Sequence, residues 1–392
     1  MPRQAWTLCL GGFINRFGSF VVPFLTIYLT HNGYSPAQAG TVVSFYGIGS
    51  LGAAAIGGYL ADRFGRRTTI AFSMFASAAA MLLLSRAGSL ALIAFLTGLA
   101  GLTAELYRPA TAALIADLIP SERRVSGFAL YRLAINTGVA AGTAVAGFLA
   151  DRSFALLFLG DAATSLAFGV IALVALPAHT ATPRSGAAAD SPGSRPQGII
   201  GMLKSDHRFG VFLVASTLSG FVYFQSLTTL GLQVRALGLS NAAYGGLLAL
   251  NGLLILALEL PITTLTQRFP KLRVMALGLL FIGLGFGLVA FAHSLPFLGL
   301  TVVLWTFGEM LNSPVAAAYV ADLAPEHLRG QYQGAWGLTS GLGLILAPAL
   351  GTRLFAWSPT WLWLLCGLLG LLAAWLVFIF GRSVPDKTNA DG

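Results

Sequence analysis

Charged and amide side chains interrupt several long apolar segments of this sequence, and these are the residues whose chemistry matters most. A charge at the centre of a bilayer-spanning helix costs roughly 2.5–3.5 kcal/mol on insertion scales, so each one requires a partner or a function. Such residues pair with each other, carry protons or contact a transported solute. They are Asn15, Arg16, Glu105, Arg108, Arg132, Asn136, Asp161, Glu259, Glu309 and Asn312.

Glu105 and Arg108 are three residues apart, which places them on one face of a helix, where they can pair. Two interpretations remain open: a structural ion pair, or a Glu105 that faces a cavity and exchanges a proton beside Arg108. Arg16 has no acid near it in sequence and must find Asp161, Glu105 or a substrate carboxylate.

Asp161 also lacks a neighbour of opposite charge. It either pairs with Arg16 or Arg132 across the helices, which we favour, or it exchanges a proton. Glu259 is followed by Leu260-Pro261, and a proline permits a kink, so a gating role competes with the favoured role of a structural or membrane-surface contact.

The composition indicates that these residues belong to a membrane protein. Of 392 residues, 56% are hydrophobic and 9% are charged, against about 25% charged residues in ordinary soluble domains. At about 20 residues per span, the length accommodates roughly twelve membrane helices and leaves no soluble domain. The expected fold is therefore an all-α membrane protein. The predicted spans are 5–30, 38–61, 68–86, 89–118, 125–150, 153–177, 210–235, 242–266, 272–292, 294–323, 330–355 and 359–381.

The positive net charge of +9 belongs to loops and not to a nucleic-acid surface. With the N-terminus inside, sixteen of the 23 Lys and Arg residues fall in cytoplasmic segments and four fall outside, which predicts that both termini are cytoplasmic. Cys9 and Cys366 lie at opposite ends of the chain, so we expect neither a disulfide nor a metal site. No phosphate-binding loop suggests ATP hydrolysis or an enzyme. We expect a monomer.

The two halves of the chain are copies of each other. A shift of 205 residues places Ser35 on Ser240, Arg66 on Lys271 and Asp117 on Asp322. Because each copy holds six helices, both have the same orientation, as two bundles (1–177 and 208–392) joined by a linker at 178–207. The shift also places Glu309 next to the position of Glu105, which favours a Glu309 that faces a central cavity.

A basic turn stands between the second and third predicted helices. Its pattern, Gly-x-x-x-Asp-Arg-x-Gly-Arg-Arg, resembles the signature loop of the major facilitator superfamily of secondary transporters. The resemblance implies two six-helix bundles with pseudo-two-fold symmetry, and an acid, here Asp62, that latches the cytoplasmic side against the start of helix 11 near Arg329. We expect Gly58 to let two helices approach closely. The residues of this gating motif are Gly58, Asp62, Arg63, Gly65, Arg66 and Arg67.

The glycines of helix 5 resemble the antiporter motif of drug exporters in that superfamily. Gly138, Gly142 and Gly147 would permit close helix packing. The motif is incomplete, since Thr143 replaces its proline and Ala146 replaces one of its glycines. The resemblance implies a drug:proton antiporter of a bacterial inner membrane, powered by the proton gradient and without a cofactor.

The predicted function is export of amphipathic small molecules, because aromatic residues near the cavity outnumber fixed polar groups. Translocation of a lipid or siderophore is an alternative. Proton-driven import of a nutrient is another, although few amides occur in helices 7 and 8. We predict that Glu105 couples transport to protons, with Asp161 or Glu309 as the second acid. The predicted cavity residues are Arg16, Arg108, Asn136, Tyr223, Glu259, Trp305, Asn312 and Trp336.

Overall fold

Twelve apolar helical spans occur in the part of the chain that the computed structural model describes, residues 2–120, 123–178, 206–325 and 328–380. The predicted spans are confirmed, with ends that differ by a few residues; most of the linker predicted at 178–207 lies outside the described residues. The first six spans are α1 (Arg3–Phe17) with α2 (Val21–His31), α3 (Pro36–Phe64), α4 (Arg66–Leu84), α5 (Leu90–Glu105) with α6 (Tyr107–Leu118), α7 (Arg124–Arg152) and α8 (Phe154–Ala175). The last six are α10 (His207–Tyr223) with a short turn and α11 (Thr229–Ala236), α12 (Asn241–Thr266), α13 (Lys271–Leu288), α14 (Leu295–Leu323), α15 (Arg329–Leu346) with α16 (Thr352–Trp357), and α17 (Pro359–Phe380).

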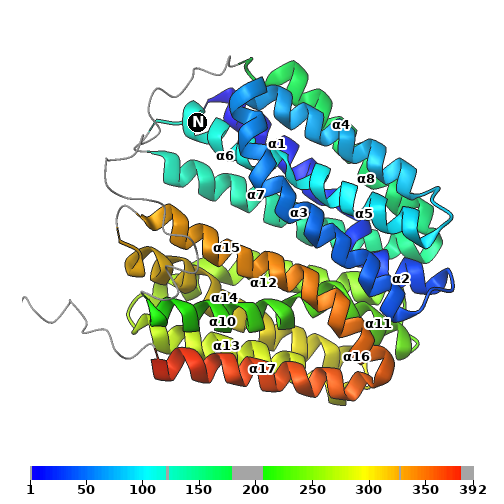
Figure 1. Cartoon of the computed structure of the whole chain (residues 1–392), viewed down its shortest axis with the longest axis vertical. Coiled ribbons are helices and arrows are strands. Elements are labelled where there is room, and N and C mark those ends of the chain that lie inside the picture. Colours follow the sequence, from blue (N-terminus) through cyan, green and yellow to red (C-terminus); the bar gives the residue numbers. More distant parts are fainter. Residues whose placement is uncertain (1, 121–122, 179–205, 326–327, 381–392) are drawn as a thin grey trace, which may run out of the picture.

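The spans form two bundles of six. Helices α1 to α8 pack among themselves, as do α10 to α17, and Figure 1 shows the two sets one above the other. The bundles meet where α7 packs on α12, α3 on α15 and α16, and α2 on α11. The N-terminus and the end of α17 lie at the same end of the molecule in Figure 1. We call this the terminal side and the opposite end the far side.

The repeat appears in the backbone at the start of α3 and of α12. Gly33 and Gly238 both adopt positive φ, 87° and 74°, a conformation that glycine takes without steric cost. Ser35 and Ser240 then cap the two helices, each accepting a hydrogen bond from the backbone amide three residues on. The register of 205 residues is therefore structural as well as sequential.

A matching ion pair occurs in each bundle on the terminal side. Arg66 pairs with Asp117, and Lys271, its repeat equivalent, pairs with Asp322. Each pair joins the helix that follows the basic turn to the end of a neighbouring helix. The two bundles thus keep the same contact although the second copy of the turn has lost its acid.

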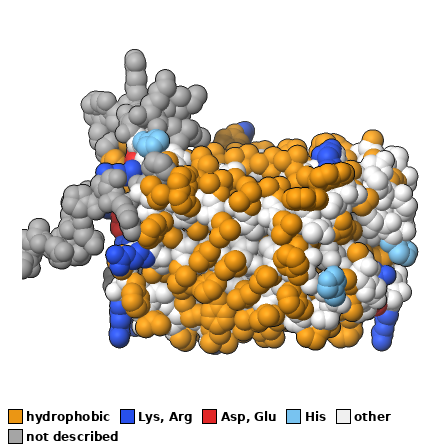
Figure 2. Space-filling view, turned by 90° about the horizontal axis from the view of Figure 1, so that it is seen from below, with side chains coloured by type: hydrophobic (Ala, Val, Ile, Leu, Met, Phe, Trp, Pro, Cys, Tyr) orange, Lys and Arg blue, Asp and Glu red, His pale blue; other side chains and the backbone are white. Residues whose placement is uncertain are grey.

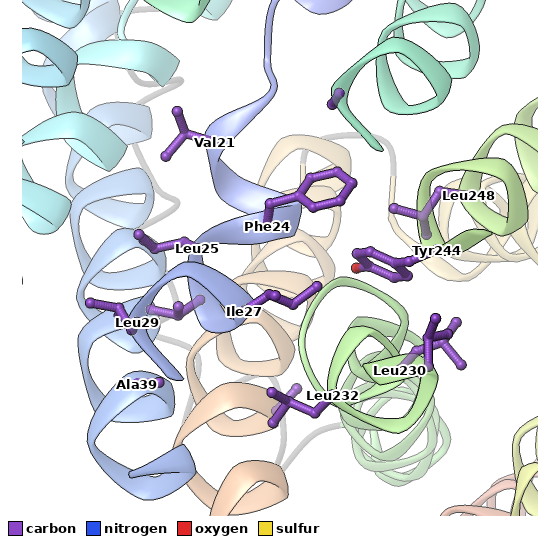
Figure 3. Packing of buried hydrophobic residues seen from close by; sticks show 14 of the residues in the cluster. Val21, Phe24, Leu25, Ile27, Leu29, Ala39, Leu230, Leu232, Tyr244 and Leu248 are labelled. Carbon is purple, nitrogen blue, oxygen red and sulfur yellow. The ribbon is translucent and has the colours of Figure 1, made fainter. Parts of the chain in front are cut away.

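Among the described residues, the buried hydrophobic core is shared by the two bundles on the far side and not on the terminal side. One hydrophobic cluster there contains residues of both bundles, among them Phe24 of α2 and Tyr244 of α12, whose rings meet edge to face 5.1 Å apart (Figure 3). On the terminal side each bundle has a separate cluster, one around Met74 and Leu114 and the other around Phe209 and Tyr332. The chain is therefore open between its bundles towards the terminal side.

The outer surface matches a lipid environment. Figure 2 shows hydrophobic side chains across the middle of one face, with Lys and Arg gathered at the two ends. Exposed Trp361, Leu368 and Trp375 of α17 belong to this surface. Such an apolar belt between charged ends is what a bilayer stabilises.

Candidate functional site

A cavity of about 270 Å³ lies between the bundles. Its wall comes from α7 of the first bundle and from α10, α12 and α14 of the second. On α12 the lining residues Asn251, Ile255 and Glu259 are four residues apart, with Gly252 next to the first, so they form one face of the helix. The lining residues are Arg132, Asn136, Val139, Tyr223, Asn251, Gly252, Ile255, Glu259, Glu309, Met310 and Ser313.

Glu309 is held in the wall by neutral hydrogen-bond donors. The hydroxyl of Tyr223 donates to Oε1 at 3.1 Å, and Nδ2 of Asn251 donates to Oε2 at 3.0 Å. The same Nδ2 lies 3.0 Å from the hydroxyl of Thr306. Among the described residues, no basic group lies within ion-pair distance of Glu309. A charge on this partly buried carboxylate lacks a counter-ion, so a proton or a cationic solute would neutralise it.

Aromatic packing fixes the Tyr223 side chain. Its ring meets Trp305 edge to face at 5.9 Å, and Trp305 stacks on Phe286 at 5.3 Å. Trp305 is fully buried behind Tyr223 and is not part of the cavity wall. The prediction that Trp305 lines the cavity is wrong; the residue instead supports one of the two donors to Glu309.

Arg132 and Glu259 form an ion pair that joins α7 of one bundle to α12 of the other. Glu259 is mostly shielded, and Arg132 keeps more than half of its side chain exposed. The sequence allowed Arg132 to pair with Asp161, and the structure shows a different partner. Of the two roles proposed for Glu259, the contact between bundles is the one present. Pro261 lies within α12 without ending it.

Glu105 lies at a break in the fourth span and contacts two arginines. α5 ends at Glu105, four residues before Pro109, because a proline ring excludes the carbonyl of the residue four positions back. Nη2 of Arg16 lies 3.3 Å from Oε1, and Nε of Arg108 lies 2.5 Å from Oε2. Arg16 also lies over the ring of Tyr107, 5.8 Å from its centre. Both carboxylate oxygens are therefore already paired with cations.

Asp161 caps a helix instead of pairing with an arginine. The first span, expected to be one helix from 5 to 30, is interrupted between α1 and α2. This break frees the first amide of α2, and Val21 N donates to Oδ2 of Asp161 at 3.4 Å. An anion at a helix N-terminus is stabilised by the unpaired amides and the helix dipole. The favoured pairing of Asp161 with Arg16 or Arg132 is wrong.

The close approach expected at the helix 5 glycines is present. A Cβ atom at Gly138 would lie 2.7 Å from the carbonyl oxygen of Phe13, and one at Gly142 would lie 2.2 Å from that of Phe17. These contacts pack α7 on α1 within the first bundle. Gly147 instead faces the second bundle, where a Cβ atom on it would lie 2.7 Å from the carbonyl oxygen of Asn241.

Comparison with known families agrees with this architecture. The model of the Major Facilitator Superfamily matches residues 8–235 and 228–392. The chain belongs to this superfamily. It is a multi-pass membrane transporter.

Three relatives cover most of the chain. An uncharacterized transporter, YqjV, of Bacillus subtilis is 29% identical over 88% of this chain and 85% of its own length. A Na(+), Li(+), K(+)/H(+) antiporter of Planococcus maritimus is 28% identical, covering 96% and 94%. The multidrug resistance protein MdtH of Aeromonas hydrophila is 27% identical, covering 93% and 92%.

Among solved structures, a peptide transporter of the POT family, crystallised with sulfate, superposes with a TM-score of 0.82. It is 20% identical, with 97% of this chain and 94% of that chain covered. At this identity the likeness establishes the superfamily fold and not the solute.

The basic turn of the superfamily has the expected backbone but not the expected contacts. Gly65 adopts a positive φ of 86°, which allows α3 to turn directly into α4. The close helix approach predicted at Gly58 is wrong in this conformation, since a Cβ there would meet nothing within 4 Å. At Gly57 it would lie 2.6 Å from the carbonyl oxygen of Leu106.

The basic side chains and the acid of this turn differ in their contacts. Arg66 pairs with Asp117 and donates to the carbonyl of Ala113 at 3.2 Å. The guanidinium of Arg63 lies 5.8 Å from the ring centre of Tyr59, on the same helix. Asp62 is exposed, and within the described residues it has no hydrogen bond or ion pair. Arg67 is half-buried. The contact expected between Asp62 and α15 is absent in this conformation, in which the terminal side is open.

The structure places three of the eight predicted cavity residues in the wall, Asn136, Tyr223 and Glu259, and adds Glu309, which was predicted as a coupling acid. Trp305, behind Tyr223, and the other four lie elsewhere. Arg16 and Arg108 lie beside Glu105, Asn312 faces α13 at Gly278, and Trp336 packs on Phe212.

Sequence reasoning overlooked Asn251, although an amide within an apolar span, eight residues before Glu259 and on the same face, was a usable signal. Gln225 was also overlooked. It is fully buried, and its carboxamide oxygen accepts from the hydroxyl of Thr229 at 2.7 Å. The scarcity of amides in helices 7 and 8, the reason given against a nutrient importer, is therefore not a valid argument.

Proposed function

We propose that this chain is a proton-coupled secondary transporter that exports amphipathic or lipophilic small molecules by alternating access. Both termini are cytoplasmic in this proposal, as the distribution of Lys and Arg indicates, so the terminal side is the cytoplasmic side of a bacterial inner membrane. The observation that carries the proposal is the placement of Glu309, a partly buried acid in the wall of the cavity between the bundles, with no basic partner among the described residues.

Glu309 fits proton exchange better than the other two predicted acids. Protonation of Glu105 would break contacts with both Arg16 and Arg108. Asp161 is engaged with the start of α2, away from the cavity wall. Glu309 faces the cavity and is held by uncharged donors, so it can bind and release a proton without leaving a buried arginine unpaired. We therefore place the coupling role at Glu309.

The cavity wall favours an adaptable, partly apolar solute. Val139, Ile255 and Met310 contribute apolar surface, and methionine adapts to solutes of different shape. The volume of about 270 Å³ is close to the lower limit of ligand sites, roughly 300 Å³. MdtH, a multidrug resistance protein by name, is one of the relatives. Together these features support an amphipathic solute of drug size.

Exchange of an alkali cation for a proton is a second candidate. The Planococcus relative is named as an antiporter of this kind. Glu309 contacts the hydroxyl of Tyr223 directly, and Asn251 contacts both Glu309 and the hydroxyl of Thr306. The carboxylate and the two hydroxyls offer the hard oxygen ligands that such cations require. Under this alternative the cation would occupy the site that the proton leaves.

Transport by purified protein in proteoliposomes with an imposed pH gradient tests the proposal. The panel contains a lipophilic amine, a lipophilic neutral dye, a sugar, a fluorescent lipid and Na⁺. The proposal expects uphill movement of the amphipathic compounds only. Movement of Na⁺ alone would support the second candidate, and movement of the sugar or the lipid alone would contradict both.

A further inference from the structure

Asp151 joins the two bundles on the far side. It lies at the end of α7, in the first bundle, and reaches the start of α12, in the second. Its Oδ1 accepts from the backbone amide of Asn241 at 2.8 Å, and its Oδ2 accepts from that of Ala242 at 2.9 Å. Ser240 accepts from the next amide, that of Ala243, at 3.1 Å. The first three amides of α12, which have no partner inside the helix, are thus all satisfied, two of them by the other bundle.

Glycines bring the two backbones together at this point. A Cβ atom at Gly147, one turn before Asp151, would lie 2.7 Å from the carbonyl oxygen of Asn241. A Cβ atom at Gly245 would lie 2.4 Å from the carbonyl oxygen of Thr143. A carboxylate on a short side chain reaches the amides of α12 only while this packing holds. The contact therefore depends on closure of the far side.

The segment that ends at Asp151 repeats the superfamily turn on the opposite side of the membrane. Residues 147–152 read Gly-Phe-Leu-Ala-Asp-Arg and residues 58–63 read Gly-Tyr-Leu-Ala-Asp-Arg, so they differ only in one aromatic residue. α3 ends on the terminal side and α7 on the far side. In this conformation Asp151 is engaged, whereas Asp62 has no hydrogen bond or ion pair within the described residues.

We propose that Asp151 is the latch of the far side and that it opposes Asp62. The pair of hydrogen bonds from α12 stabilises the conformation in which the cavity opens towards the terminal side. When the far side opens, α12 moves away from α7 and the carboxylate loses both amides. A charge at a helix N-terminus is favourable, so this loss raises the free energy of the far-open conformation.

The second half of the chain has no equivalent latch. The 205-residue shift places Ala356 at the position of Asp151 and Pro36 at that of Asn241. Alanine offers no acceptor, and proline has no amide hydrogen to donate. At this second junction of the bundles Arg353 donates instead to the hydroxyl of Thr41, at 3.1 Å. Closure of the far side by a helix-capping carboxylate is therefore a property of α7 and α12 alone among the described helices.

Two variants test the latch from its two sides. Asp151→Asn removes the charge from the acceptor. Asn241→Pro removes one donor and leaves Asp151 intact, and it copies the Ser-Pro start of α3, where proline is well tolerated. Spin labels at Gly88→Cys and His293→Cys, exposed far-side positions in different bundles, report the separation of the far ends.

Each variant is expected to raise the ratio of far-open to far-closed protein roughly tenfold. Asp62→Asn is expected to change the same ratio in the opposite direction, and Asp151→Asn combined with Asp62→Asn should return it towards that of the unmodified protein. If both latch variants lower the melting temperature but leave the distance distributions unchanged, Asp151 is a structural cap of α12 and the proposal is wrong. None of these readouts depends on the identity of the solute.

Discussion

Replacement of Glu105 by glutamine should destabilise the protein because it leaves Arg16 without its acid. The side chain of Arg16 is 14% exposed, and its ion-pair contact among the described residues is with Glu105, at 3.3 Å. Removal of one partner from a buried ion pair typically costs roughly 3–5 kcal/mol. Arg108 contacts the same carboxylate, but its side chain is 60% exposed and can be solvated. An exposed pair is worth about 0–1 kcal/mol.

These magnitudes set an order for four variants. Glu105→Gln should lower the stability by about 3 kcal/mol. Arg108→Ala should lower it by less than about 1 kcal/mol. Arg16→Met leaves Glu105 paired with Arg108, so its effect should lie between these two. The double variant Arg16→Met/Glu105→Gln removes both buried charges and should be more stable than Glu105→Gln alone.

Thermal unfolding in detergent, followed with a thiol-reactive dye, gives this order directly. Cys9 and Cys366, one near each end of the chain, are both buried and free, so they react only as the protein unfolds. If the losses in the double variant simply add, or if Arg108→Ala is as harmful as Glu105→Gln, Arg16 is not held by Glu105 and the reasoning fails.

Three further predictions use matched pairs or a single acid. Gly142→Val should lower the melting temperature strongly, because its Cβ would lie 2.2 Å from a carbonyl oxygen. Gly246→Val, whose Cβ would meet nothing within 4 Å, should have little effect. Equal melting temperatures for the two variants would contradict the close packing of α7 on α1. Asp161→Asn should lower the stability by about 0.3–2 kcal/mol while uphill transport persists, and lost transport with an intact fold would reveal a proton site. Asp117→Asn should be more destabilising than Asp322→Asn on thermal unfolding, since the pair of Asp117 is the more buried; the reverse order would count against this.

The spans and the repeat were predictable because they depend on local properties. The apolar lengths fix the number of helices, and a register of 205 residues follows from matching short motifs. Ser35 and Ser240 cap their helices as their places in the repeat require. The breaks in the first and fourth spans were not predicted, although Pro109 gave a sufficient signal for the second of them.

The partners of the buried charges were harder to predict than the charges themselves. Arg16 and Glu105 are 89 residues apart, and their meeting depends on the rotation of two helices about their own axes. Asp161 was assigned to an arginine because the break that exposes the amide of Val21 was not foreseen. The absence of a contact at Asp62 reflects which side of the membrane is open, and a sequence does not specify one conformation of an alternating transporter.

The most direct test of the proposed coupling is uphill transport by Glu309→Gln. The control is Asp322→Asn, which removes an exposed acid near the C-terminal end of the same helix, α14. Both proteins are reconstituted, and accumulation of an amphipathic substrate against its gradient is compared with its exchange at equal pH. Coupling at Glu309 predicts that Glu309→Gln loses accumulation and keeps exchange, while Asp322→Asn keeps both. Accumulation by Glu309→Gln at the rate of the unmodified protein would contradict the central claim.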